Sequence, residues 1–234
     1  MRSYIKGHWK QRQRFYYCHG ERRTEFTDFY DLEEEYKNFE VKEHSRIFQY
    51  HASIWAGIYK RSFIEENKLR FIVTPQATYS DYSWMAMTYG CAKKITVVHT
   101  ALYFYNWGSP TSSTSMMGEK YKYMLYHMGE ASRILKEHRI FEAVCADFLF
   151  QSTEIIMDIG RRVAWELRNE YFSELSKLYS LHFYDCSFEI ELDEQMKKIV
   201  ELILEGKREE FYDRIFNEVF INTNINQIKS SGYV

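Results

Sequence analysis

Apolar positions in the first half of the chain form short runs that predict an α/β unit. Segments 52–59, 70–74 and 95–105 are rich in β-branched and aromatic residues, which is typical of buried strands. Segments 60–68 and 81–94 instead carry apolar residues at three- and four-residue intervals, so each predicts a helix. Strands that alternate with helices in this way indicate the α/β (α+β) class.

The pattern is different after residue 118, where helical periodicity continues almost to the end of the sequence. Residues 106–118 (NWGSPTSSTSMMG) are small and hydroxylated, which is typical of a loop between units. We therefore predict two domains, 1–117 and 118–234, the second being a helical region. The helices expected there are Glu119–His138, Glu142–Leu167, Tyr171–Tyr179, Leu192–Leu204 and Lys207–Asn222.

The first fifty residues give weaker signals. Residues 4–17 predict a hairpin with Gly20 turning the chain, and residues 28–43 predict an acidic, aromatic helix. Within that helix, Glu33–Glu35 resembles a metal cluster only in composition. Adjacent helical positions point in different directions, so a solvated helix face is the better interpretation.

Composition excludes several classes of function. The net charge of -2 provides no basic field for nucleic acid. The four cysteines lie far apart, without the spacing of a zinc site or a disulfide framework. No apolar run is long enough for a transmembrane helix or a signal peptide. We therefore expect a cytoplasmic protein, or one that is peripheral at the inner face of the membrane.

Asp81 is the candidate catalytic residue, because a carboxylate at a loop-helix junction can take a proton from an alcohol. The alternative is a structural role, in which Ser80 or Asp81 accepts hydrogen bonds from the first helical turn. Spacing alone favours the capping role, and the two roles are compatible. An ionised carboxylate serves both.

Other candidate residues are polar or aromatic and lie near this helix. The hydroxyl-rich loop around Ser112 and Ser113 suits a phosphate or a sugar, although an ordinary linker has the same composition. Trp84 and Trp107 suit a sugar groove, and Trp84 equally suits the core. His99 is read as a histidine of a strand rather than as a metal ligand.

Residues 54–113 contain three blocks in succession: IWAGIYKRSFIEENKLRF, then TYSDYSW, then CAKKITVVHTALYFYNWGSPTSS. Their order and spacing give the chain a resemblance to the second half of the catalytic domain of family 2 glycosyltransferases. It implies a partial GT-A-like mixed sheet with helices, followed by the C-terminal helical region. Asn106 stands where the family has an arginine, and Ser80 stands where an acid is commoner.

The resemblance also implies a reaction. Family members transfer a sugar with inversion from a nucleotide-diphospho-sugar to a glycan or lipid-linked acceptor, in cell-surface polysaccharide synthesis, and use Mg or Mn. Asp81 matches their catalytic base, and Ser112 and Ser113 match hydroxyls near the donor diphosphate. The metal-binding Asp-x-Asp of the family does not occur in this sequence, so no metal site is assigned to any residue.

Two functions follow as expectations. In the first, the chain is the acceptor-side half of a glycosyltransferase, with little activity alone, and needs a partner chain, self-association or an upstream segment to complete its sheet. In the second, it is a non-catalytic interaction module or a truncated remnant. Donor sugar, acceptor and linkage are not specified by the residues present.

Overall fold

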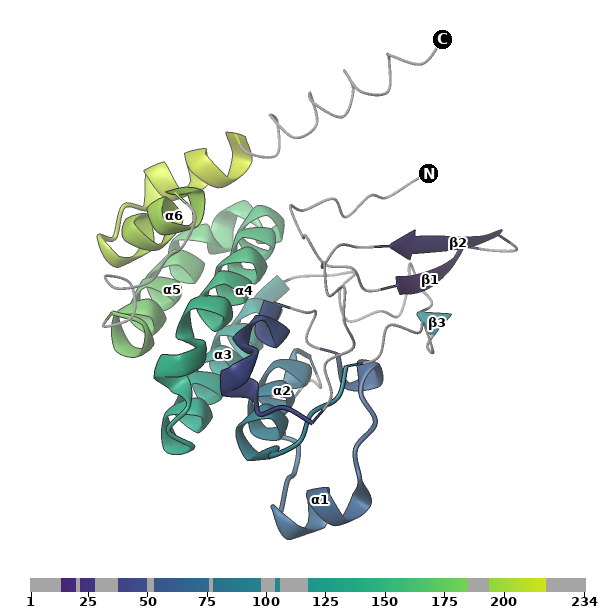
Figure 1. The fold of residues 1–234 in the computed structure, drawn as a ribbon. Coiled ribbons are helices and arrows are strands. Elements are labelled where there is room, and N and C mark those ends of the chain that lie inside the picture. The colour runs from purple at the N-terminus through teal and green to yellow at the C-terminus, as the bar shows by residue number, and fades with distance from the viewer. Residues whose placement is uncertain are drawn as a thin grey trace.

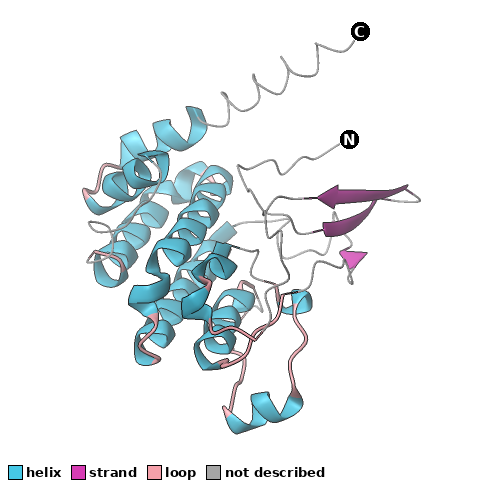
Figure 2. Ribbon diagram, viewed as in Figure 1, coloured by secondary structure: helices cyan, strands magenta, loops and turns pink. Residues whose placement is uncertain are grey.

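The computed structural model shows a molecule built mainly of helices (Figures 1 and 2). The helices form a stack, and a small sheet and one short helix lie outside that stack. The structure describes these ranges: 14–19, 22–27, 38–49, 53–75, 78–97, 104–105, 118–184 and 194–217.

The α-helices account for most of the described chain. They are α1 (Arg61–Glu66), α2 (Ser80–Cys91), α3 (Tyr121–Glu137), α4 (Phe141–Arg162), α5 (Arg168–His182) and α6 (Glu194–Leu204), followed by helical residues 208–217. The predicted helices after residue 118 are confirmed as helical over their described parts. Their boundaries differ by a few residues, since Tyr171–Tyr179 extends at both ends and α4 stops before a 3₁₀ turn. The division into two domains stays a prediction.

Shorter elements join these helices. The 3₁₀ turns are η1 (Val41–Glu43), η2 (Ser45–Gln49), η3 (Ile54–Ala56), η4 (Gly118–Lys120) and η5 (Trp165–Leu167). The strands are β1 (Arg14–His19), β2 (Arg22–Thr27) and β3 (Phe104–Tyr105).

The small sheet has the order β2-β1-β3. Strands β1 and β2 are antiparallel, with Arg14 opposite Thr27, and β3 runs parallel to β1, with Tyr16 opposite Phe104. A hairpin was predicted near the N-terminus, and the observed hairpin lies further along the chain. Residues 4–13 and the turn residue Gly20 lie outside the described residues, as does the predicted helix up to residue 37.

The expected fold class, an α/β GT-A-like mixed sheet with helices, is wrong. Segment 52–59 was predicted as a buried strand, but Ile54–Ala56 forms η3 and Ile58 is exposed. Segment 70–74 is not in a sheet either, and 95–105 contributes only a bridge from Ile95 to Phe39 and the two residues of β3. A strand requires a neighbouring strand for its backbone groups, and the described chain supplies none to the first two segments.

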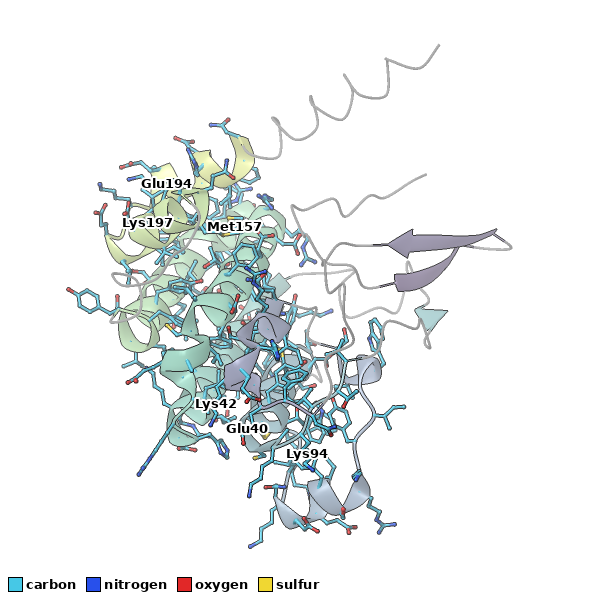
Figure 3. The ribbon with its side chains drawn as sticks, in the orientation of Figure 1. Glu40, Lys42, Lys94, Met157, Glu194 and Lys197 are labelled. Atoms are coloured by element: carbon cyan, nitrogen blue, oxygen red, sulfur yellow. The ribbon has the colours of Figure 1, made fainter. Side chains whose placement is uncertain are left out.

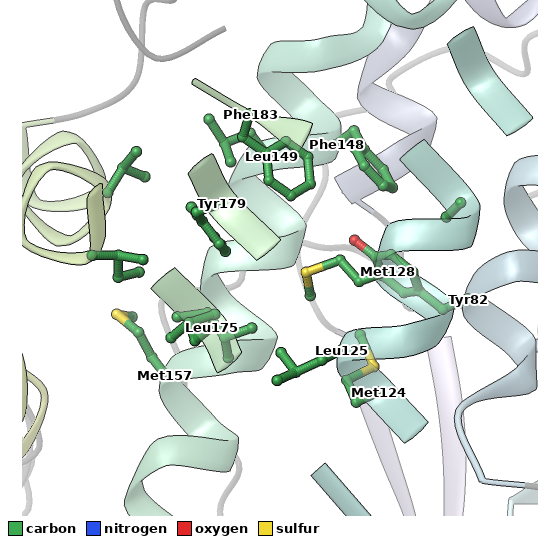
Figure 4. Packing of buried hydrophobic residues seen from close by; sticks show 14 of the residues in the cluster. Tyr82, Met124, Leu125, Met128, Phe148, Leu149, Met157, Leu175, Tyr179 and Phe183 are labelled. Atoms are coloured by element: carbon green, nitrogen blue, oxygen red, sulfur yellow. The ribbon is translucent and has the colours of Figure 1, made fainter. Parts of the chain in front are cut away.

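One buried cluster holds the helices together and includes residues from both halves of the sequence. Phe148 on α4 contacts the rings of Phe48 on η2 and Tyr82 on α2, with ring centroids 5.7 and 5.5 Å apart. Phe183 lies on its other side, at 5.8 Å. Figure 4 shows Tyr82, Phe148 and Phe183 within this packing. The aromatic content of the chain is thus used largely in its core.

The outer helices are amphipathic. On α6, buried Met196, Ile199 and Ile203 follow helical spacing, whereas Glu194 and Lys197 lie on the outer side of the molecule (Figure 3). None of the helices in the described ranges has the length and the apolar character that crossing a bilayer would require.

We expect Phe148→Ala to lower the free energy of unfolding by about 3–5 kcal/mol, because the fully buried ring leaves a cavity between α2 and α4. Urea denaturation measures this loss. Tyr126→Ala is the control, since that side chain is 48% exposed, and we expect a change within about 0.5 kcal/mol. A loss for Phe148→Ala no larger than that of the control would contradict the packing described.

Candidate functional site

Asp81 lies in the first turn of α2, as the sequence predicts. The helix begins at Ser80, and the residue before it, Tyr79, has a left-handed backbone (φ 65°). The Asp81 carboxylate is half-buried and accepts hydrogen bonds from the backbone N–H of Ile54 and from its own N–H. Because Ile54 begins η3 and Asp81 lies in the first turn of α2, the side chain connects these two turns.

The environment of Asp81 favours its protonated form. Burial raises the pKa of the carboxyl group above its usual value, and the two backbone N–H groups oppose this shift without cancelling it. A carboxylate with a raised pKa accepts a proton more readily than an exposed one. The arrangement therefore suits a base as well as a structural link.

Trp84 lies one turn along α2 from Asp81 and contacts two further aromatic side chains, and we call Tyr59, Phe71 and Trp84 the aromatic rack. Phe71 stacks on Trp84 with ring centroids 4.2 Å apart and 24° between the planes. Tyr59 meets Trp84 edge-on at 5.6 Å. Trp84 itself is buried, whereas Phe71 is 45% exposed, so Phe71 is the ring of the rack that a ligand can reach.

The packing of the rack explains its local structure. The side chain of Thr88 donates a hydrogen bond to the carbonyl oxygen of Trp84, within α2. Burial raises the pKa of the Tyr59 hydroxyl above its usual value. Tyr59 therefore stays neutral and belongs to the packed side of the site.

The predicted site residues are only partly placed. Asp81 and Trp84 lie on the same helix, three residues apart, which brings carboxylate and indole to one region. Trp107, Ser112 and Ser113 lie outside the described residues, and so does His99. Their roles stay predictions.

A buried pair of polar residues was missed by sequence reasoning. Ser83 on α2 and His127 on α3 are fully buried, and the Ser83 hydroxyl lies 2.9 Å from His127 Nδ1. Within the described part of the chain, His127 Nε2 has no hydrogen-bond partner. The available signal was His127 itself, which is a polar residue among the apolar positions Met124, Leu125 and Met128.

The Ser83–His127 pair resembles two members of a nucleophilic triad, but its burial excludes that role in this conformation. Nucleophilic catalysis requires that the hydroxyl reach a substrate, and neither side chain is exposed to solvent. The pair instead fixes the contact between α2 and α3. Burial lowers the pKa of His127, with the charge of Glu130 opposing, so the imidazole is held neutral.

The described residues do not fit the Mg or Mn that the resemblance implies. In the ranges that the structure describes, no three His, Cys, Asp or Glu side chains lie close enough to hold a metal ion. Asp81 is bonded to backbone N–H groups, which a metal ligand set would have to replace.

Two surface cavities lie away from Asp81. One of 670 Å³ separates α5 from residues 206–210, and one of 290 Å³ lies between α3 and α5. Salt bridges engage the principal cations of the larger cavity, Lys177, Lys207 and Arg208, with neighbouring glutamates. Neither cavity adds a reactive group to the site.

Comparisons with known proteins add no information on the site. No family model, curated protein or solved structure matches this chain.

Asp81→Asn removes the charge of the side chain and keeps an oxygen that can accept hydrogen bonds. The variant therefore separates the electrostatic cost of the carboxylate from the effect of its hydrogen bonds. Because the folded pKa is raised, the stability linked to Asp81 is present at low pH and is lost as pH rises through the folded pKa. We expect Asp81→Asn to match the wild type near pH 3.5 and to be at least as stable at pH 7, in urea unfolding at each pH.

Asp213→Asn, at an exposed helical position, is the control and should follow the wild type at both pH values. If Asp81→Asn were less stable than the wild type at pH 7 and equal to it at pH 3.5, the charged form of Asp81 would stabilise the fold, contrary to the raised pKa.

His127 predicts a second pH dependence, of opposite sign. Its folded pKa is lowered, so the linked stability is present above about pH 6.5 and is lost as pH falls through the folded pKa. We expect the free energy of unfolding to fall between pH 7 and pH 5, and His127→Gln to reduce that slope. His182, whose pKa burial also lowers, contributes the remainder. An unchanged slope in His127→Gln would contradict the buried neutral imidazole.

Proposed function

We propose that this chain provides the acceptor side of a sugar-transfer reaction, with Asp81 as the general base. The observation that carries the proposal is a half-buried carboxylate of raised pKa on the same helix as Trp84, on which the partly exposed ring of Phe71 stacks. Sites for sugars combine aromatic surfaces, which cover C–H groups, with a few polar atoms that fix the hydroxyls. The aromatic rack and Asp81 supply both.

The chemistry of the proposed step is an inverting displacement. The acceptor hydroxyl gives its proton to the Asp81 carboxylate while its oxygen forms a bond to the anomeric carbon of the donor. The bond from that carbon to the diphosphate oxygen breaks, and the diphosphate leaves with the electron pair. Nothing in the described ranges is assigned to hold the diphosphate, so the donor side is to be supplied by other residues or by a partner chain.

The resemblance to family 2 glycosyltransferases supports the reaction and not the fold. Of the three blocks that carry the resemblance, TYSDYSW contains the carboxylate, which is found at the start of a helix. The strands that accompany this block in the family are replaced here by η3 and by extended chain. The proposal therefore depends on the residues around Asp81 and carries no claim about a sheet.

A second candidate function is a non-catalytic interaction module. It is favoured by Ile58 and Val73, two apolar side chains that are 95% and 91% exposed on one projecting segment. Exposed apolar side chains in one segment indicate a surface that another molecule covers. The two functions are compatible, because a transferase half that lacks its donor site also needs a partner.

Glycan binding tests the proposal. We expect the chain to bind immobilised bacterial oligosaccharides, and Phe71→Ala to weaken that binding by about tenfold, because one stacking surface is lost. Tyr126→Ala, on α3 and similarly exposed, is the matched control and should bind as the wild type does. Absence of glycan binding, or equal binding by Phe71→Ala and the wild type, would refute the acceptor site.

The same glycans then test the base. Transfer from UDP- and GDP-sugars, measured with Mn present, should fall by about 10²–10⁴-fold in Asp81→Asn while glycan binding is retained. Because the isolated chain is expected to be weakly active, the assay includes the proteins encoded by neighbouring genes. Equal transfer by Asp81→Asn and wild type would remove Asp81 from the mechanism.

A further inference from the structure

The segment 57–75, which we call the arm, projects from the helical stack. Helix α1 lies at its tip, away from the stack, and is joined to it by two extended limbs, 57–60 and 69–75 (Figure 1). No residue of α1 is buried. The limbs are packed on their inner side. There Leu69 is buried and Ile72 packs against the core. Tyr59 and Phe71 contact Trp84.

The backbone of the limbs is largely unpaired. Ile58, Phe71, Ile72 and Val73 make no backbone–backbone hydrogen bond within the described part of the chain. Extended chain with free N–H and C=O groups has the properties of a sheet edge, to which another strand can add. Water satisfies these groups in the isolated chain, and a second strand would satisfy them equally well.

The side chains of the limbs are apolar where the backbone is free. Ile58 and Val73 are the two most exposed large apolar side chains among the described residues. Covering either side chain removes apolar surface from water, which is favourable by about 25 cal/mol per Å² of apolar surface buried. The same short stretch therefore offers backbone pairing and apolar contact together.

The charge of the arm restricts its partner. Lys60, Lys68 and Arg70 are exposed and form no ion pair with a described residue, whereas Arg61 is paired with Glu65 at 2.7 Å. Glu66, the other acid of the arm, forms no ion pair with a described residue. The arm is thus locally basic on a chain whose net charge is -2, and it favours an acidic partner.

We propose that the limbs are a docking site for an extended, acidic segment of a partner protein, which adds to them as a strand. An anionic lipid surface would satisfy the charges, but free backbone groups are costly in hydrocarbon. A second copy of this chain would satisfy the backbone groups, but would place Lys60, Lys68 and Arg70 against the same basic residues of the other copy. The inference does not depend on the sugar-transfer proposal, since it requires neither Asp81 nor a glycan.

A synthetic peptide tests the docking site. The probe has ten residues, with valine and threonine alternating and two glutamates at each end, and its binding to the full chain is measured by fluorescence anisotropy. We expect saturable binding, and protection from amide hydrogen exchange at residues 58 and 71–73. Val73→Asp should weaken binding by about tenfold, because it places a like charge and a polar group in the contact.

Leu181→Asp is the matched control, because Leu181 is a 75% exposed apolar residue on α5, far along the chain from the arm, and this variant should bind the probe as the wild type does. A peptide N-methylated at alternate residues keeps the side chains but lacks half of its backbone donors, and should not bind. Equal binding of the methylated peptide, or no binding of either peptide at millimolar concentration, would overturn strand addition.

Two further measurements test the two other occupants, an anionic lipid surface and a second copy of this chain. If the wild-type chain sediments with phosphatidylglycerol vesicles and Val73→Asp does not, the limbs bind a lipid surface. If the wild-type chain dimerises in analytical ultracentrifugation and Val73→Asp does not, the limbs bind a second copy of the chain. Either result would overturn the proposal, and neither would bear on glycan binding at Phe71.

Discussion

The contact of Tyr82 with α4 is the interaction on which the rest of the structure depends. Its ring packs against Phe148, and its hydroxyl hydrogen-bonds to the Ser152 hydroxyl, so one side chain fixes both the depth and the orientation of α2. Asp81 is the residue immediately before Tyr82. The position of the carboxylate is therefore set by the core, and a rigid element carries it, as a site requires.

Helix α2 is buried more completely than an ordinary surface helix. Residues 82–86 are all buried, so the helix has no solvent face over its central turn. A helix enclosed in this way must satisfy its polar side chains internally. Ser83 does so with His127, and Thr88 with backbone carbonyl groups, which makes these polar residues part of the packing.

Helices were predictable from the sequence, and the sheet was not. The periodicity of Tyr121–Glu137 or Phe141–Arg162 is a property of one segment, and each helix satisfies its own backbone. A strand instead depends on a neighbour that its own sequence does not specify. Asp81 was found because a helix start has a local signal, whereas the pairing of Ser83 with His127 joins residues 44 positions apart and has none.

The error at segments 52–59 and 70–74 and the projecting arm have one cause. Ile58 and Val73 made these segments appear to be buried strands, and the same two side chains are almost fully exposed in the isolated chain. An apolar, extended segment with free backbone groups is unfavourable as a permanent surface of a monomer. Its pattern predicts burial against a strand. The partner strand that we propose would supply this burial, which connects the composition of the arm to the docking site proposed for it.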